Sequence, residues 1–376
     1  MVQDYEYAWG DDPCDITTEI VEKLDVKNIS QVVGSLDHLL SFCTIPSIKK
    51  VIAFDIDERA LAFAELKIST IKNLDFNHMC RFFNMSKYRK FIGGEHNHPL
   101  LDPFNRMSLK EFKRTYKKVT KNLSDKTKKL IDTNVEYKDS CGFDCFCSFR
   151  EGSRLVNPSV LPWAQKERYN FLRNNLDNII LYKASLDPQY GNYINDIIGD
   201  EKFDFVWPIN ALDHGVDFLP FLNFCIQSSK VNGYVMMLFG IKDPYIGLQE
   251  IFSNIINKPN EDYAIKINQI QNKPIWTIYI DDVFKKLGFE LEENILNEIS
   301  KKYFPRQENV WLDDDINEAW SHRSINNIQD IFLLYKKTKE IDPLSPSELI
   351  NIIETLPRYF RRGLITSVDI NKYYNI

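Results

Sequence analysis

The feature that most constrains the fold is a regular alternation of short apolar stretches with amphipathic ones. Asp15 to Leu24 has the pattern of a short helix, and Val26 to Val33 has that of a buried strand. Leu36 to Phe42 again suits a helix, and Val51 to Phe54 is a second, compact apolar strand. Glu58 to Asn73 follows, with its apolar residues at helical spacing. This order predicts the beginning of a parallel sheet whose strands are joined by helices.

The alternation is then interrupted and later resumes. Phe76 to Asn175 is rich in lysine and includes a highly charged helix predicted from Leu109 to Leu130, so we expect a helical insertion here. Further strands are predicted at Asn178–Tyr182, Asp204–Trp207, Gly233–Phe239, Phe289–Leu291 and Ile331–Tyr335. The expected fold class is α/β, a doubly wound and mostly parallel sheet of about seven strands with a helical insertion.

Composition and charge restrict the classes of protein to which the chain can belong. With 376 residues, 44% of them hydrophobic and 27% charged, it is long enough to fold around a core. The net charge of −6 provides no overall basic field for a phosphate backbone, so we expect no nucleic-acid partner. No apolar run approaches the roughly 20 residues that span a bilayer, and Met1 to Gly10 lacks a signal-peptide pattern. We therefore expect a cytoplasmic protein with at most peripheral membrane contact, and its 7 cysteines, an odd number, favour reduced thiols.

The first two strands end at residues that suit a nucleoside. In open α/β sheets ligands bind outside the carboxyl ends of the strands. Gly34 and Ser35 follow the first strand, where a residue without Cβ lets a ligand approach the backbone. Asp55 closes the second strand, where a carboxylate can accept both hydroxyls of a ribose. The phosphate-binding G-x-G-x-x-G pattern is absent, which argues against NAD and favours a nucleoside without pyrophosphate, such as S-adenosylmethionine.

Four segments resemble a known family, one of them Ala53 to Asp57 at the end of the second strand. Tyr7 to Pro13 resembles its Trp-Glu-Asp-Pro opening, Leu36 to Leu40 its Leu-Asp-Tyr-Leu, and Ala64 to Phe76 its Glu-Leu-Lys helix with the following Ile-x-x-Leu-x-Tyr. On these segments the chain is similar to the 3-amino-3-carboxypropyl transferases of betaine-lipid synthesis. That family also has an Asn soon after the fourth strand, which Asn210 matches, while Asn210 to His214 also resembles the Asn-Ala-Leu-Asp-His of some class I methyltransferases.

The resemblance implies a fold, a donor and a reaction. The fold would be that of class I S-adenosylmethionine-dependent methyltransferases, and the donor would be S-adenosylmethionine. The enzyme would transfer the 3-amino-3-carboxypropyl group to an amine or hydroxyl of a small-molecule or lipid acceptor and release methylthioadenosine. Methyl transfer in the same pocket, and a scaffold that binds a partner through the basic insertion without catalysis, stay open as alternatives. The oligomeric state is left undefined.

We expect the organisation and site residues to follow from this family. Residues 1–75 would form the N-terminal segment and first half of the donor-binding Rossmann domain, 76–175 the insertion over the acceptor, 176–341 the second half, and 342–376 a helical tail. Asp213 and His214 are the nearest bases for the acceptor's proton. Arginines ahead of the third strand could bind the methionine carboxylate, and Trp9 could cover the sulfonium. The predicted cofactor-binding residues are Trp9, Gly34, Ser35, Asp37, Asp55, Asp57, Arg150, Arg154, Ser185, Asp187, Pro208 and Asn210.

Two further signals are given structural interpretations. Cys141, Cys145 and Cys147 invite a metal site with His96 and His98, but a Cys-x3-Cys-x-Cys run has neither zinc-ribbon nor ferredoxin spacing, so no metal is expected. The run from Arg106 to Lys129 has ten Lys or Arg and two acidic residues. Its apolar stripe favours a helix packed on the parent domain with a solvated basic face, and docking on anionic lipid is the alternative.

Overall fold

The computed structural model describes residues 14–83, 107–132, 161–209, 211, 216, 218–240, 278–303, 330–355 and 365–366. Its strands are β1 Asn28–Val32, β2 Lys50–Asp55, β3 Ile179–Lys183, β4 Phe203–Trp207, β5 Ser229–Gly240, β6 Ile278–Tyr279, β7 Phe289–Leu291, β8 Asp330–Lys337 and β9 Ile365–Thr366. Its helices are α1 Cys14–Leu24, α2 Asp37–Phe42, α3 Glu58–Asn73, α4 Phe76–Phe82, α5 Leu109–Val119, α6 Asp125–Asp132, α8 Lys166–Asn175, α9 Ile194–Ile198, α10 Phe218–Ser228, α13 Ile280–Lys286, α14 Glu293–Tyr303 and α15 Pro346–Thr355, with short 3-10 turns η2 Pro162–Ala164 and η3 Leu176–Asn178.

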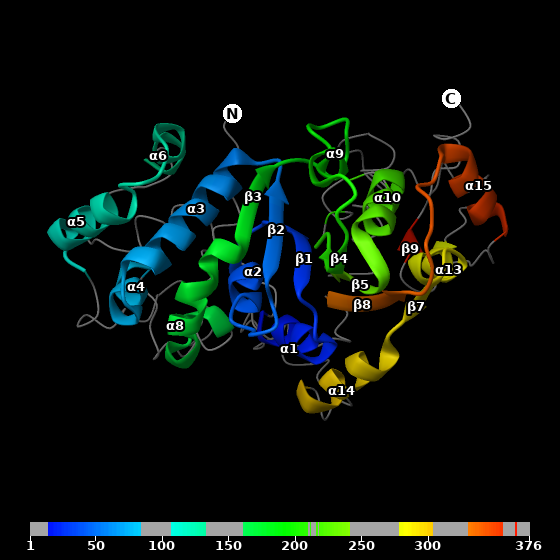
Figure 1. Ribbon diagram of the computed structural model, residues 1–376, viewed down its shortest axis with the longest axis horizontal. Helices are drawn as coiled ribbons and strands as arrows, with labels where there is room; N and C mark the ends of the chain where they lie inside the picture. The colour runs from blue at the N-terminus through cyan, green and yellow to red at the C-terminus, as the bar shows by residue number, and fades with distance from the viewer. Residues whose placement is uncertain are drawn as a thin grey trace, which may run out of the picture. The chain divides into compact units, whose positions relative to one another are not determined.

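The main sheet has seven strands in the order β3-β2-β1-β4-β5-β8-β7 (Figure 1). The pairs β2–β3, β1–β4 and β4–β5 are parallel, while β8 runs antiparallel to both β5 and β7. The strand order reverses direction at β1, which is the topological switch of a doubly wound sheet. This is the class I methyltransferase-like arrangement, and the predicted fold class is confirmed.

The chain divides into two compact units, which are described in turn. Unit 1 contains β2, β3 and the helices α1 to α6 and α8. Unit 2 contains Asn28–Gln31 of β1 together with β4, β5, β7 and β8 and the helices α9, α10, α13 and α15.

In unit 1, β2 is a buried strand against which α3 packs (Figure 1). The side chains of Val51–Phe54 are no more than 1% exposed. The Asp57 side chain caps α3 by accepting a hydrogen bond from the Arg59 N–H (2.8 Å), which satisfies one of the donors left free in the first helical turn. The cap explains why α3 begins at Glu58, where its apolar spacing predicts the start of the helix.

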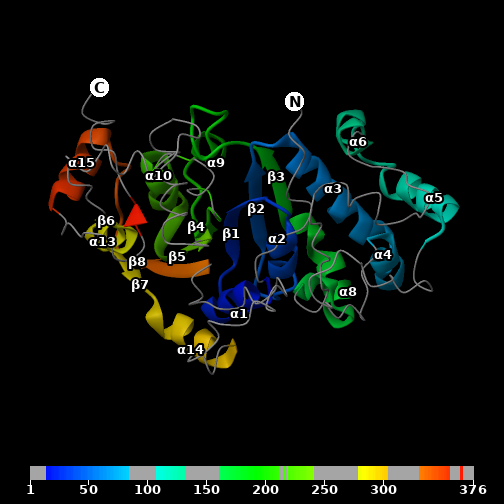
Figure 2. The same cartoon turned by 180° about the vertical axis from the view of Figure 1, so that it is seen from behind.

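The elements described within residues 76–175 of unit 1 are helical, and α4, α5 and α6 pack on α3 (Figure 2). The prediction of one helix from Leu109 to Leu130 is wrong, because α5 ends at Val119 and α6 begins at Asp125. The Thr120 hydroxyl bonds back to the Tyr116 carbonyl (2.8 Å), and Ser124 Oγ accepts the Thr127 N–H (3.0 Å). Side chains that bond to their own backbone end one helix and start the next.

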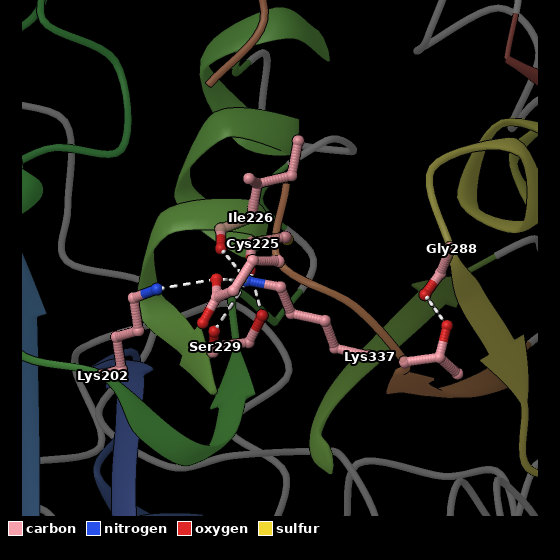
Figure 3. Close-up of polar contacts among 8 residues, drawn as sticks. Lys202, Cys225, Ile226, Ser229, Gly288 and Lys337 are labelled. Carbon is pink, nitrogen blue, oxygen red and sulfur yellow. Dashed lines mark hydrogen bonds and ion pairs between the residues drawn. The ribbon is translucent and has the colours of Figure 1, made fainter. Parts of the chain in front are cut away.

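In unit 2, a buried lysine joins β8 to α10 (Figure 3). Lys337 Nζ donates to the carbonyls of Ile226 (2.7 Å) and Ser229 (3.0 Å), at the end of α10 and the start of β5. Its side chain is 0% exposed, and burial lowers the pKa of this ammonium. A cation at a helix C-terminus is favoured by unpaired carbonyls and by the helix dipole, so Lys337 fixes the end of α10.

The end of the chain departs from the prediction of a helical tail. The tail contains α15, which Ser345 caps through its Oγ and the Glu348 N–H (3.3 Å), but it also contains β9. This strand pairs antiparallel with β6 in a separate two-stranded sheet. Among the described residues, no helix combines the length and apolar character needed to cross a membrane.

Candidate functional site

The residues after β1 and the carboxyl end of β2 are joined directly in unit 1. The Asp55 carboxylate accepts the Gly34 N–H at Oδ2 (3.1 Å) and the Asp57 N–H at Oδ1 (2.9 Å). Gly34 and Asp55 are both half-buried, so each keeps some surface toward solvent. The structure therefore brings together the two positions that the sequence predicts for nucleoside contact.

Burial changes the acidity of this carboxylate. Burial raises the pKa of Asp55 from 3.8 to about 6, although hydrogen bonds from the Asp57 and Gly34 backbones act in the opposite direction. Because the folded-state pKa lies above the ordinary value, the folded protein holds this proton more tightly than the unfolded chain. The stability that this proton contributes is complete below the ordinary pKa and is lost as the pH rises through about 6. At neutral pH the site therefore holds an ionised carboxylate at a cost in stability.

The loop between β1 and α2 has an unusual backbone. Gly34 has φ +48° and Leu36 has φ +67°, both in the left-handed region that L-residues other than glycine rarely adopt. The Leu36 N–H donates to the Val33 carbonyl (2.7 Å), which closes a tight turn. Leu36 is 1% exposed, so burial of its side chain offsets the strain of its backbone.

A buried ion pair lies beneath this loop. Lys67 Nζ, on α3, donates to Asp37 Oδ1 (2.8 Å) and to the Ser35 carbonyl (2.6 Å), and Trp163 Nε1 donates to the same Asp37 oxygen (3.1 Å). Asp37, Lys67 and Trp163 are each 0% exposed. Burial lowers the pKa of the Lys67 ammonium, and the Asp37 carboxylate opposes that shift. Asp37 thus offers no surface to a ligand and instead helps to hold the loop from inside.

Sequence reasoning did not assign roles to Lys67 and Trp163. The signal for Lys67 was a lysine within the apolar spacing of α3, between the buried residues Leu66 and Ser69. A lysine in such a stripe is almost never fully buried without a partner, so it required an acid nearby. The contact of Trp163 could not be predicted in this way, because an indole N–H can donate to many kinds of acceptor and the sequence does not indicate which one lies within reach.

Asp57, a second predicted cofactor ligand, is engaged by its own helix. Besides capping α3, its carboxylate accepts bonds from the Arg59 guanidinium at 2.7 Å and 3.0 Å. Arg59 and Asp57 are both partly exposed. These contacts account for Asp57 without a ligand.

Unit 2 holds the predicted residues Ser185, Asp187 and Pro208. The Asp187 N–H donates to Ser185 Oγ (3.0 Å), and Asp187 Oδ1 accepts the Gln189 N–H (2.9 Å) in a local turn. Asp187 is 0% exposed, and among the described residues its Oδ2 has no hydrogen-bond partner. Pro208 is buried directly after β4, and Ile209 has φ +50°.

Several predicted residues lie outside the described part of the chain. These are Trp9, Arg150, Arg154, Asn210, Asp213 and His214, together with the Cys141, Cys145, Cys147, His96 and His98 group. Within the described residues, no cluster of three or more His, Cys, Asp or Glu could hold a metal ion.

Two further arginines that precede the third strand make contacts within unit 1. Arg168 donates to Glu22 Oε1 (2.9 Å) and to Thr44 Oγ1 (3.2 Å). Arg173 donates to the Lys72 carbonyl (2.8 Å) at the end of α3. Both side chains therefore tie α8 to its neighbours.

The similarity of this chain to known proteins is distant. No family model matches the chain, and no curated protein matches it. Among solved structures, the chain matches that of the rRNA methyltransferase AviRa from Streptomyces viridochromogenes with 10% sequence identity and a TM-score of 0.30. The match covers 61% of this chain and 75% of that chain.

The expectation of no nucleic-acid partner is corrected. That expectation depended on the net charge of −6, whereas a solved structure that matches this chain is that of an rRNA methyltransferase, which is named for a nucleic-acid substrate. Net charge averages over the whole surface and conceals local fields. The overall acidity of the chain therefore does not exclude a nucleic acid, and the exclusion is withdrawn.

Proposed function

We propose that the chain is an S-adenosylmethionine-dependent transferase and that unit 1 carries the ribose-binding part of its donor site. The observation that carries the proposal is the Asp55 carboxylate at the end of β2, bonded to the Gly34 N–H of a left-handed turn. In doubly wound sheets an acid at this position accepts the ribose hydroxyls. The class I methyltransferase-like order of the strands supports the same assignment.

The Asp55 carboxylate has capacity left for a ligand. Each of its two oxygens accepts one backbone N–H, and a carboxylate oxygen has two lone pairs. Within the described residues, these two oxygens keep acceptor capacity that would serve the 2′ and 3′ hydroxyls. Ile56 follows directly and is 46% exposed, although it is a large apolar residue. Its side chain would offer an apolar surface to the adenine ring beside the ribose.

The group transferred is proposed to be 3-amino-3-carboxypropyl, on the strength of the sequence resemblance. Bound S-adenosylmethionine would supply an electrophilic carbon, and an acceptor amine or hydroxyl would form a bond to it while the carbon–sulfur bond breaks toward sulfur. Asp213 or His214 would take the acceptor's proton. Further donor contacts are proposed for Ser35, Ser185, Pro208, Asn210, Trp9, Arg150 and Arg154, whereas Asp37 and Asp187 are fully buried and would hold the backbone, and Asp57 would cap α3.

Mass spectrometry of the nucleoside product tests the proposed reaction. Purified protein would be incubated with S-adenosylmethionine and a small-molecule and lipid extract, beside a control without enzyme. Methylthioadenosine above the control supports transfer of the carboxypropyl group, and S-adenosylhomocysteine would replace it with methyl transfer. If neither nucleoside forms and titration calorimetry detects no donor binding, the transferase proposal is wrong.

A matched pair of variants tests the donor site itself. Asp55→Asn places an amide where two backbone N–H groups and the ribose need an acceptor, and should weaken donor binding about tenfold to a hundredfold. Asp177→Asn is the control, because this acid pairs with Lys72 at the surface and is itself 88% exposed. Unchanged donor affinity in folded Asp55→Asn protein would refute the assignment of the ribose site.

A further inference from the structure

The outer face of α5 is a continuous row of cations. Its members are exposed and recur three and four residues apart, and we name them the α5 basic row: Lys110, Lys113, Arg114, Lys117 and Lys118. Residues with this spacing lie on one side of a helix. The one acid of α5, Glu111, is turned away from the row and pairs with Arg81 of α4 (2.9 Å).

The opposite face of α5 fixes the row in place. Phe112 and Val119 are 0% exposed and Tyr116 is 8% exposed, so the apolar side of the helix is buried within unit 1. Phe112 stacks on Phe82 of α4 at 5.2 Å between ring centroids. The Tyr116 hydroxyl donates to Asp132 Oδ1 of α6 (2.7 Å), which locks α5 against the next helix. The cations therefore project from a rigid support.

The row is electrostatically unfavourable by itself. Like charges three or four residues apart destabilise a helix, and every member of the row has such a neighbour. Packing of the buried face offsets part of this repulsion. A row of anions lying along the helix would remove it.

We propose that the α5 basic row docks the phosphate backbone of a nucleic acid. From Lys110 to Lys118 the row extends about 12 Å along the helix axis, at 1.5 Å per residue. A duplex carries one phosphate charge per roughly 1.7 Å of its axis, so a backbone along the row would meet several cations at once. Contacts to phosphates do not read bases, so this docking is independent of sequence.

The described surface fits a nucleic acid better than a membrane. Helices that lie on membranes insert apolar side chains into the acyl boundary. Here the apolar side of α5 is covered by protein, and none of the exposed large apolar residues in the described chain belongs to α5 or α6. The α5 basic row is a single line of exposed cations along one helix, which matches one strand of phosphates better than it matches a plane of lipid headgroups.

Binding of defined oligonucleotides tests the proposal without requiring any activity. A fluorescein-labelled 20-nucleotide single-stranded RNA and a 20-base-pair DNA duplex of unrelated sequence would be titrated with the full chain over a series of salt concentrations. We expect binding that weakens with salt, with a slope of about −0.7 per phosphate neutralised for the single strand and about −0.9 for the duplex. The two arms identify which nucleic acid carries the phosphates.

Two double variants with the same change in net charge isolate the row. Arg114→Glu with Lys118→Glu reverses its centre, and should weaken binding about tenfold or more at low salt and reduce the salt slope by about 2. Lys166→Glu with Lys286→Glu reverses two exposed lysines outside the row and should leave binding within about threefold of the original. Both variants act at exposed positions, so far-UV circular dichroism should report intact folds.

Three outcomes would overturn the proposal. In the first, neither oligonucleotide shows salt-dependent binding; in the second, the two double variants weaken binding equally. In the third, the full chain binds vesicles that contain phosphatidylserine but binds neither oligonucleotide. The last outcome would reassign the row to an anionic membrane. Because the readout is binding, each outcome is separate from success or failure of the transferase proposal.

Discussion

Replacement of Lys67 by Met tests whether the buried ion pair positions the donor loop. The substitution keeps an unbranched side chain of similar length and removes the ammonium that donates to Asp37 and to the Ser35 carbonyl. Asp37 is left as a fully buried carboxylate without its cation. Removal of one partner from a buried ion pair costs about 3–5 kcal/mol, so we expect the free energy of unfolding to fall by an amount in this range.

A second variant separates positioning from stability. Lys67→Met combined with Asp37→Leu removes both charges, and replacement of a buried pair by apolar residues is often neutral or stabilising. The double variant should therefore recover much of the lost stability. It should not recover donor affinity, because the Ser35 carbonyl still lacks the donor that fixes it in the loop. We expect donor binding to stay at least about tenfold weaker than in the unmodified protein, a loss of about 1.4 kcal/mol.

Urea unfolding measures the stability of each variant, and titration calorimetry with S-adenosylmethionine measures its donor affinity. Lys337→Met is the matched control, because Lys337 is also a fully buried lysine bonded to two main-chain carbonyls, but in unit 2. It should lose stability and keep donor affinity. Donor affinity that follows stability alone in all three variants would refute a positioning role for Lys67.

Three other predictions follow from the site. Since the pKa of Asp55 is about 6, donor affinity should rise with pH between about 5 and 7 and then level off. This pH dependence should vanish in Asp55→Asn, and a flat profile for the unmodified protein would contradict the prediction. Trp163→Phe removes the indole donor to buried Asp37 and should lower the free energy of unfolding by about 1–3 kcal/mol in urea, whereas no change would mean that water replaces the bond. Asp57→Ala removes the cap of α3 and should cost about 0.5–2 kcal/mol in thermal unfolding with donor affinity unchanged; a large loss of affinity would assign Asp57 to the ligand.

Long periodic elements were predictable from the sequence because one face of each is buried. The bounds of α3 coincide with the apolar spacing from Glu58 to Asn73, and β2 extends the predicted Val51–Phe54 by one residue at each end. The order of seven such strands was enough to predict the class of fold. The break between α5 and α6 was missed, because an apolar stripe continues across Ser124 and only the side-chain cap of that residue interrupts the helix.

The candidate site was predictable only in part, because chain position and side-chain contact carry different information. The sequence placed Gly34 and Asp55 after neighbouring strands, which is a property of topology. Whether a polar residue such as Asp37 faces a ligand or a buried lysine depends on which helix packs beneath the loop. That information is held in contacts between residues about 30 and 126 positions apart in the chain, such as Asp37 with Lys67 and Trp163.

The contacts around the loop explain how a strained backbone can be ready for a ligand before the ligand arrives. Gly34 is held through its N–H by Asp55 on β2, Ser35 through its carbonyl by Lys67 on α3, and Leu36 through its N–H by the Val33 carbonyl. The first two bonds come from β2 and α3 and the third from within the turn, so the left-handed residues on either side of Ser35 are held from outside the loop as well as from within it. An apolar side chain at position 67 could fill the same space, but it could not hold the Ser35 carbonyl. The geometry that Lys67 and Asp37 impose on the loop thus explains why the chain buries an ion pair in spite of its cost. For the same reason, a variant without either charge should regain stability but not donor affinity.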